Sequence, residues 1–337
     1  ATFTEGDLER FLQKYVETED IETVKESFWK QGEVVQLFDR EKKEPSFKFT
    51  SREVVEEEQQ IVRLSDKIQT KEALSINTKT DFFHKASSGL NEEQKEAFDK
   101  IISGRKLSCV QGFAGTGKSY LLNALKGVYE KEGYTVRAFG PDSATSKVLE
   151  EKGFSHAENI YRFLFAVHHE KREIKKGKEL WVLDEAGKLG NRPLLEFVKE
   201  AEKRNVQLVF SGCSSQFSSV ERGEMFKFFC KRYGAVMLKD IQRQSYKEEK
   251  EITKNLAYGN VGEAIDKLAA SGGIIWASNS DEAYAKLIRT WANDRVNFPG
   301  ASSAIIAHTN DEVKVLNELA RQVRKERGEI EEKEFLC

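Results

Sequence analysis

The stretch Gly112-Phe113-Ala114-Gly115-Thr116-Gly117-Lys118-Ser119 decides the fold of this chain. It fits the pattern G-x-x-x-x-G-K-[ST], whose glycine-rich backbone cradles phosphate groups in nucleoside triphosphatases. An apolar segment at 106–111 predicts a strand before it, and the helical spacing of apolar residues over 120–132 predicts a helix after it. A loop between a strand and a helix directs unpaired N–H groups and the positive end of the helix dipole at one point. The sequence therefore predicts an anion-binding site.

The residue types of this loop have separate tasks. Lys118 is expected to reach the β- and γ-phosphates of a nucleotide. The Ser119 hydroxyl is an oxygen ligand of the kind that Mg²⁺ prefers. The predicted phosphate- and metal-binding set is Gly112, Gly115, Thr116, Gly117, Lys118 and Ser119.

Two neighbouring carboxylates follow another predicted strand. Asp184 and Glu185 come directly after the apolar run 180–183. Ligands of open α/β sheets bind at the carboxyl ends of strands. In phosphate-loop ATPases the first acid holds the hydrated Mg²⁺ and the second positions the attacking water. The alternative is an acidic N-cap of the following helix.

The composition limits the function classes that remain. The 337 residues hold 56 acidic and 54 basic side chains, for a net charge of −2. Without an overall basic excess, a nucleic-acid site must be a local groove. The four cysteines stand alone, which favours reduced thiols over a disulfide framework or a zinc site. No apolar run approaches 18 residues and no signal peptide is recognisable, so we expect a cytoplasmic protein without membrane contact.

The first 85 residues predict a small α+β domain. Residues 4–30 favour one helix, 33–38 and 46–50 favour two strands around a charged turn, and 51–68 favour a second helix. A polar stretch then leads to Leu90.

From Leu90 the pattern alternates between helix and strand. Continuous apolar strands are predicted at 106–111, 135–139, 180–183, 206–210 and 235–238. Such strands are typical of a parallel sheet covered on both faces, so we expect an α/β fold with a doubly wound sheet.

The remainder of the chain divides into two predicted parts. Residues 246–300 read as a helical connector, with a short strand at 274–277 and a helix over 281–294. Residues 301–337 begin a new α/β unit, with a strand at 304–307 and a helix from 310 to about 327.

Further motifs occur in a fixed order around the phosphate loop. The segment 90–94 resembles the "L-x-x-x-Q" adenine-reading element of superfamily 1 helicases. The segment 140–147 resembles helicase motif Ia, and 183–187 resembles the "D-E-A-G" form of motif II.

Three later segments continue the series. Residues 210–217 resemble motif III, 241–244 resemble motif IV, and 306–310 are similar to the opening of a second motor domain. The combination most resembles the RecD-like helicase region of conjugative relaxase-helicases of the TraA/TraI type. The resemblance covers about residues 85–330. It implies a RecA-like fold in a first motor domain at 86–245, with ATP and Mg²⁺ as cofactors.

The resemblance also implies roles for single residues at the nucleotide. Gln94 would read adenine, while Asp184 and Glu185 would serve metal and water. Gln216 would link the γ-phosphate to the DNA track, and Arg243 would contact the γ-phosphate. The alternatives for the last two are a solvated loop residue and a surface cation.

Single-stranded DNA is the partner that the resemblance implies. The residues expected near its backbone are Ser143, Thr145 and Lys147. Hydroxyls and a lysine in a loop after a parallel strand suit phosphate contacts, although an ordinary helix start is the alternative. Other proteins of the conjugation machinery are further candidate partners, and the sequence leaves the oligomeric state open.

The chain departs from the helicase pattern in two ways. Cys213 and Phe217 stand where the family has Asp and Leu in motif III, and a thiol supplies no fixed charge. The sequence also ends before motifs V and VI, which hold an arginine that closes on the γ-phosphate. We therefore expect weak ATP hydrolysis and no unwinding of DNA by this polypeptide alone.

Other functions remain open at this point. A degenerate helicase remnant could bind nucleotide, DNA or a protein without turnover. A small-molecule kinase with a phosphate loop is disfavoured by the Asp184-Glu185 pair, by the segment around Gln216 and by the absence of an arginine-rich lid. A GTPase is disfavoured because no Asn-Lys-x-Asp motif is present.

Overall fold

The computed structural model describes residues 2–39, 42–169, 176–213, 223–242 and 246–330. It divides into two compact units, Ala1–Lys250 and Glu251–Cys337, which are described separately.

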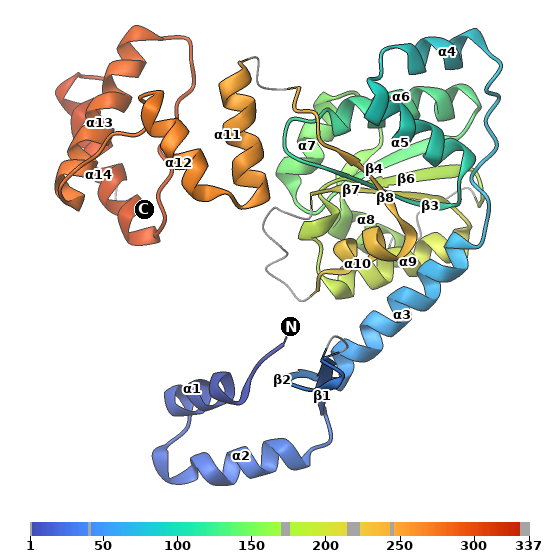
Figure 1. Ribbon diagram of the computed structural model, residues 1–337, viewed down its shortest axis with the longest axis horizontal. Coiled ribbons are helices and arrows are strands. Elements are labelled where there is room, and N and C mark those ends of the chain that lie inside the picture. Colours follow the sequence, from blue (N-terminus) through green and yellow to red (C-terminus); the bar gives the residue numbers. More distant parts are fainter. Residues whose placement is uncertain (1, 40–41, 170–175, 214–222, 243–245, 331–337) are drawn as a thin grey trace. The chain divides into compact units, whose positions relative to one another are not determined.

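The first unit is built on a six-stranded parallel sheet (Figure 1). Its strands follow the spatial order β5-β4-β6-β7-β3-β8, and every pair is parallel. Their bounds are β3 (Leu107–Gly112), β4 (Thr135–Gly140), β5 (Ala157–Asn159), β6 (Glu179–Leu183), β7 (Gln207–Gly212) and β8 (Ala235–Leu238). The predicted α/β fold class and the five predicted strands are thus confirmed. The short edge strand β5 was missed because three residues show no periodicity.

Helices cover both faces of this sheet. One face carries α5 (Glu92–Ser103), α6 (Lys118–Lys131) and α7 (Ser143–Glu151), and the other carries α3 (Arg52–Gln69), α8 (Ile160–His169), α9 (Asn191–Arg204) and α10 (Met225–Tyr233). Trp181 packs against Phe139, Phe163 and Phe197 in the second layer. Burial on both faces is the reason that the strands read as continuous apolar runs.

The parallel arrangement positions the site. Because all strands point the same way, the loops that follow β3, β4 and β6 emerge at one edge of the sheet. These loops carry the phosphate-loop sequence, the motif Ia segment and the acidic pair. The carboxyl edge of the sheet is where ligands bind in open α/β folds.

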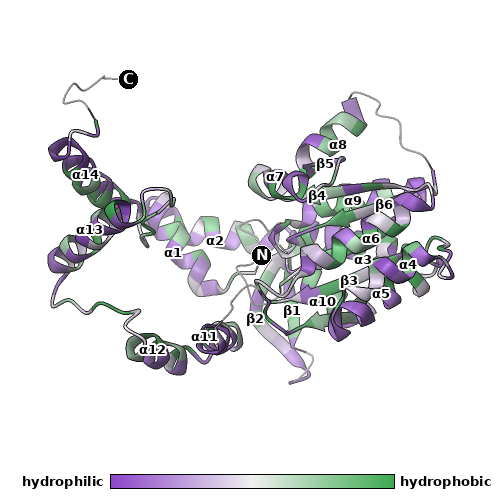
Figure 2. Cartoon of the chain, turned by 90° about the horizontal axis from the view of Figure 1, so that it is seen from above, coloured by the Kyte–Doolittle hydropathy of each residue, from purple (hydrophilic) through white to green (hydrophobic). Residues whose placement is uncertain are grey.

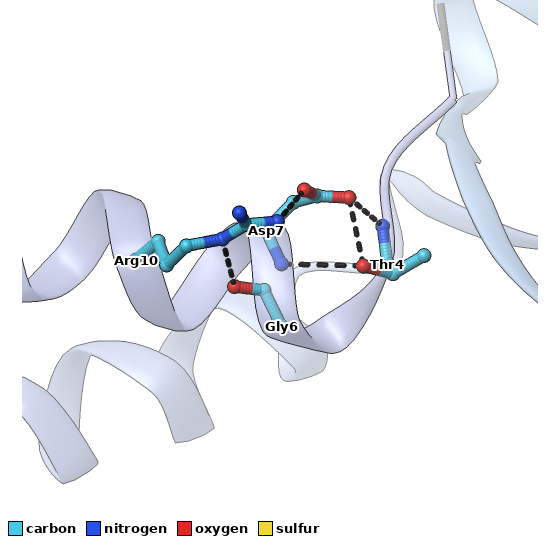
Figure 3. Close-up of polar contacts among 4 residues, drawn as sticks. All are labelled: Thr4, Gly6, Asp7 and Arg10. Carbon is cyan, nitrogen blue, oxygen red and sulfur yellow. Dashed lines mark hydrogen bonds and ion pairs between the residues drawn. The ribbon is translucent and has the colours of Figure 1, made fainter.

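The first predicted helix is wrong as a single element. The chain forms α1 (Glu5–Tyr15), a 3₁₀ turn at Thr18–Asp20 and α2 (Ile21–Lys30), with extended backbone at Val16. Lys25 of α2 pairs with Glu9 of α1 at 2.6 Å. In one straight helix these two residues would lie about 24 Å apart, so the break allows the two helices to meet. Figure 3 shows the capping box in which Thr4 and Asp7 begin α1.

The hairpin and helix after them match their predictions. Strands β1 (Val34–Asp39) and β2 (Glu44–Ser51) pair antiparallel, and α3 follows. Helix α3 buries Ile61 and Ile68 in the core beneath the sheet. A further helix, α4 (Asp81–Ser88), lies in the polar stretch before Leu90, where the sequence analysis named no element. Its Phe83 packs on Phe98 of α5 at 5.4 Å between ring centres, a tertiary contact that the local pattern does not reveal.

The second unit contains helices only among its described residues. They are α11 (Lys247–Tyr258), which spans the boundary, and α12 (Val261–Ala270), α13 (Ser280–Asn297) and α14 (Asn310–Glu326). In Figure 2 hydrophobic and hydrophilic residues both occur along α13 and α14, and α14 has the stronger amphipathic pattern of the two.

The two strands predicted in this unit are wrong. Residues 274–277 and 304–307 have no strand conformation, and Ile306 is 91% exposed. A strand needs a neighbour for its N–H and C=O groups, and neither segment has one within the described residues. No described helix is long and apolar enough to cross a membrane.

Candidate functional site

A cavity of about 630 Å³ opens at the carboxyl edge of the sheet. Four segments of the first unit form it: the phosphate loop, one side of α7, the turn after β6 and the segment after β8. Its lining residues are Ala114, Gly115, Thr116, Gly117, Lys118, Ser119, Ala144, Thr145, Val148, Lys152, Asp184, Glu185, Lys188 and Gln242.

The phosphate loop keeps its shape through close backbone contacts. Gly117 has φ 81°, which side-chain-bearing residues rarely adopt, and a Cβ there would lie 2.3 Å from Gln94 Nε2. A Cβ on Gly112 would lie 2.7 Å from Thr116 Oγ1. Neither glycine can be replaced without moving its neighbours.

The side chain of Lys118 contacts the backbone of the phosphate loop. Its Nζ donates to the carbonyl oxygens of Gly112 at 2.8 Å and Phe113 at 3.1 Å, and the side chain is buried. A bound phosphate would offer this ammonium hydrogen bonds in which the acceptor is also charged, in place of bonds to neutral carbonyls. Lys118 is among the residues that line the cavity.

Gln94 forms a hydrogen bond with the backbone of the phosphate loop. Its Nε2 donates to Thr116 O at 3.3 Å, and its Oε1 accepts from the N–H of Asn91 in a capping box at the start of α5. The side chain is buried and is not among the residues that line the cavity. Its contacts therefore fix the backbone of the phosphate loop.

The acidic pair is held by a buried serine. Asp184 Oδ1 accepts hydrogen bonds from Ser211 Oγ at 2.8 Å and from the N–H of Glu185 at 3.0 Å. Its Oδ2 accepts none from the described residues. Glu185 has φ 52°, and its Oε2 lies 3.8 Å from Lys188 Nζ. Glu185 precedes a 3₁₀ turn without a capping hydrogen bond from its side chain, so the N-cap alternative is not supported.

The residues present fit a magnesium ion. Ser119 and Asp184 both line the cavity and offer oxygen ligands, one of them a carboxylate. Mg²⁺ is commonly bound by one or two protein oxygens, with water and substrate phosphate completing the shell. The described residues contain no cluster of three or more His, Cys, Asp or Glu side chains that would suit another metal.

Thr145 lies at this cavity, not at a separate surface. Asp142 begins α7 by accepting a hydrogen bond from the N–H of Thr145 at 2.6 Å. Burial raises the pKa of Asp142, but the hydrogen bonds from Thr145 and the charge of Lys188 outweigh it and lower the pKa. Ser143 and Lys147 are exposed on the same helix and do not line the cavity.

Two predicted residues, Gln216 and Arg243, lie outside the described residues, as does Phe217. Their neighbours are placed. Cys213 is buried directly after β7, and the N–H of Gln242 donates to Gly115 O at 2.7 Å. The segment before residue 243 is thereby fastened to the phosphate loop.

Sequence reasoning missed three residues of the site. Lys152 donates to Ser119 Oγ at 2.7 Å, Lys188 lies near Glu185, and Ser211 holds Asp184. Only Lys188 had a sequence signal, because it stands three positions after Glu185.

A family model described as an AAA domain matches residues 89–279. The chain belongs to the AAA domain family. The match begins before the phosphate loop and contains every residue that lines the cavity.

Relatives of this AAA domain occur among conjugal transfer proteins. This chain is 30% identical over 244 residues to the probable conjugal transfer protein TraA of Sinorhizobium fredii, covering 72% of this chain and 22% of that protein. It is 25% identical to the conjugal transfer protein TraA of Rhizobium radiobacter, over 85% of this chain and 26% of that protein. These matches confirm the resemblance to TraA-type proteins. The chain spans about a quarter of their length.

A solved structure is also similar. The Pif1 helicase from Candida albicans aligns with a TM-score of 0.42 and 18% identity, covering 68% of this chain and 60% of that one.

Proposed function

We propose that this AAA domain binds Mg·ATP and is the first motor domain of a DNA helicase of conjugative transfer. The observation that carries the proposal is the meeting of Lys118, Ser119 and the acidic pair in one cavity. The printed names of the TraA relatives support the setting in conjugal transfer.

The proposed roles follow from the chemistry of each group. The loop N–H groups and Lys118 bind the phosphates, and Ser119 with Asp184 holds Mg²⁺. When bound, this ion neutralises charge on the phosphate oxygens. Glu185 orients the attacking water, and its place beside Asp184 at the cavity wall supports this role.

Single-stranded DNA is the proposed polymer partner. Ser143 and Lys147 are exposed on α7, the helix whose Ala144 and Thr145 line the cavity, and suit contacts with a phosphate backbone. Gln216 and Arg243 are proposed to connect the γ-phosphate with the DNA side. We propose residues 86–245 as the motor domain, 1–85 as an accessory domain, 246–300 as a connector and 301–337 as the start of a second motor domain.

Replacing Lys118 tests nucleotide binding. Lys118→Ala removes the ammonium that faces the phosphates and should weaken Mg·ATP binding at least about tenfold, or about 1.4 kcal/mol. Calorimetry measures the affinity. Lys126→Ala is the matched control, because Lys126 lies on the same helix and donates to Gly153 O outside the cavity lining. Equal affinities in wild type and Lys118→Ala would refute the proposal.

A module that binds nucleotide without coupling hydrolysis to DNA is the second candidate. The buried thiol of Cys213 favours it, because the helicase pattern has a carboxylate there. ATP hydrolysis measured with and without single-stranded DNA separates the two. Stimulation by DNA supports the motor, and binding without turnover supports the module.

A further inference from the structure

The contact between Lys152 and Ser119 joins two elements that are distant in the sequence. Lys152 is the C-cap residue that follows α7, and Ser119 stands in the first turn of α6. The Lys152 Nζ donates to Ser119 Oγ at 2.7 Å, and both residues line the cavity. The ammonium therefore occupies space next to the hydroxyl that the proposed function assigns to Mg²⁺.

We propose that Lys152 is a positioning residue that competes with Mg²⁺ for the Ser119 hydroxyl. This inference rests on the proposed function, because it concerns the metal of the same site. Mg²⁺ binds oxygen at about 2.0–2.1 Å and requires near-ideal octahedral geometry. An ammonium 2.7 Å from the same oxygen would lie within a few ångströms of the ion and repel it.

The Lys152 side chain can move away from the Ser119 hydroxyl when Mg²⁺ binds. Lys152 is exposed, and a lysine side chain has a flexible four-carbon stem. Lys118 is differently placed, since two loop carbonyls hold its ammonium in a buried position. The two lysines therefore have different roles. Lys118 binds the phosphates, and Lys152 determines the Mg²⁺ concentration at which the metal position becomes occupied.

The charges around the contact agree with this assignment. Lys188 is directed toward Glu185 at 3.8 Å, so it partly balances that carboxylate. The Asp184 Oδ2 accepts no hydrogen bond within the described residues, which leaves it available to a cation. Loss of the Lys152 charge should therefore make the metal site more attractive to Mg²⁺.

The test is the magnesium dependence of ADP binding, measured by calorimetry without turnover. Lys152→Met should lower the Mg²⁺ concentration for half-maximal enhancement of ADP affinity by about three- to tenfold. ADP affinity in EDTA should stay within about twofold of wild type. Lys152→Arg keeps charge and donor, and should behave like wild type.

Two controls isolate the contact. Lys126→Met removes a neighbouring lysine that bonds Gly153 O, and should leave the magnesium dependence unchanged. In a Ser119→Ala background Lys152→Met should produce a much smaller shift, because the hydroxyl that holds the ammonium next to the metal position is absent.

The outcomes separate the inference from the function on which it rests. Wild-type protein that binds no ADP at any Mg²⁺ concentration overturns both. Normal ADP binding with the same magnesium dependence in wild type and Lys152→Met overturns the inference alone. Tenfold weaker ADP binding by Lys152→Met in EDTA also overturns it, because Lys152 would then be a phosphate ligand.

Discussion

At the scale of the residue, Glu185 combines backbone strain with a proposed catalytic role. Its φ of 52° places a non-glycine residue in the left-handed region, which costs about 1–2 kcal/mol. Strain of this kind persists where the surrounding structure enforces it, often at functional sites. Glu185 lies between the buried strand β6 and the 3₁₀ turn at Ala186–Lys188, and both neighbours constrain its backbone.

At position 185 a glycine variant should be more stable than an alanine variant, which is the reverse of their usual order within a helix. Glu185→Gly should be more stable than Glu185→Ala by about 1 kcal/mol, because glycine adopts positive φ without strain. Both variants should lose ATP hydrolysis. Glu96 in the middle of α5 is the control, where alanine should be the more stable by about 1 kcal/mol. Chemical denaturation measures both pairs, and a more stable Glu185→Ala would contradict the role of strain.

A second prediction concerns Ser211, which is fully buried and donates to Asp184. Ser211→Ala should lower stability by about 1–3 kcal/mol, because a hydrogen bond to a charged group is lost. It should also raise the Mg²⁺ concentration needed for ATP binding, since one oxygen of Asp184 is less firmly oriented. Ser108→Ala on β3 is the control. Unchanged magnesium dependence in Ser211→Ala would show that Glu185 N–H alone positions the carboxylate.

At the scale of the element, helix α3 is fastened to α10 by a polar clamp. Asp66 accepts from Arg232 Nε at 2.9 Å, Arg232 Nη2 at 2.8 Å and Tyr233 Oη at 2.9 Å. The Arg232 hydrogen bonds lower the pKa of Asp66, with burial opposing and Tyr233 assisting. The clamp attaches α3, which follows the N-terminal hairpin, to a helix beneath the sheet.

The third prediction is a pH-dependent contribution from this clamp. Because the folded pKa of Asp66 is depressed, the stabilisation is present above the unfolded value of 3.8 and is lost as pH falls through the folded pKa. Asp66→Asn should lower Tm by about 1–3 °C at pH 7, since both partners are partly exposed and screened by solvent. The difference in Tm between wild type and Asp66→Asn should become smaller as the pH is lowered below about 4. A difference independent of pH would mean that the carboxylate charge is irrelevant.

At the scale of the whole molecule, the cavity belongs to one of the two units. Its lining runs from Ala114 to Gln242, entirely within Ala1–Lys250. The second unit buries few large side chains, among them Ile288 and Leu316, and exposes Trp276 and Phe298. Its stability against local unfolding should be the lower of the two.

The fourth prediction follows from this division. A polypeptide of residues 1–250 should bind Mg·ADP within about threefold of the full chain, because no lining residue is removed. Calorimetry of both proteins provides the comparison. Amide hydrogen exchange of the full chain should be faster in α13 and α14 than in β6 and β7. Loss of binding in the shorter protein would show that the second unit supports the site.

The sequence by itself determined the fold class and the chemical centre of the site. The strands at 106–111 and 180–183 and the loop between 112 and 119 are local patterns, set by the periodicity and steric demands of neighbouring residues. The similarity to TraA-type proteins was likewise readable from ordered motifs. The roles of single residues stay predictions.

Only the tertiary structure decided which distant residues meet. Lys152 and Ser119, or Ser211 and Asp184, are brought together because parallel strands end at one edge and their helices pack side by side. No local pattern contains such a contact. The same reason explains the wrong strands at 274–277 and 304–307: apolar β-branched residues favour a strand, but a strand forms only where another supplies its hydrogen bonds.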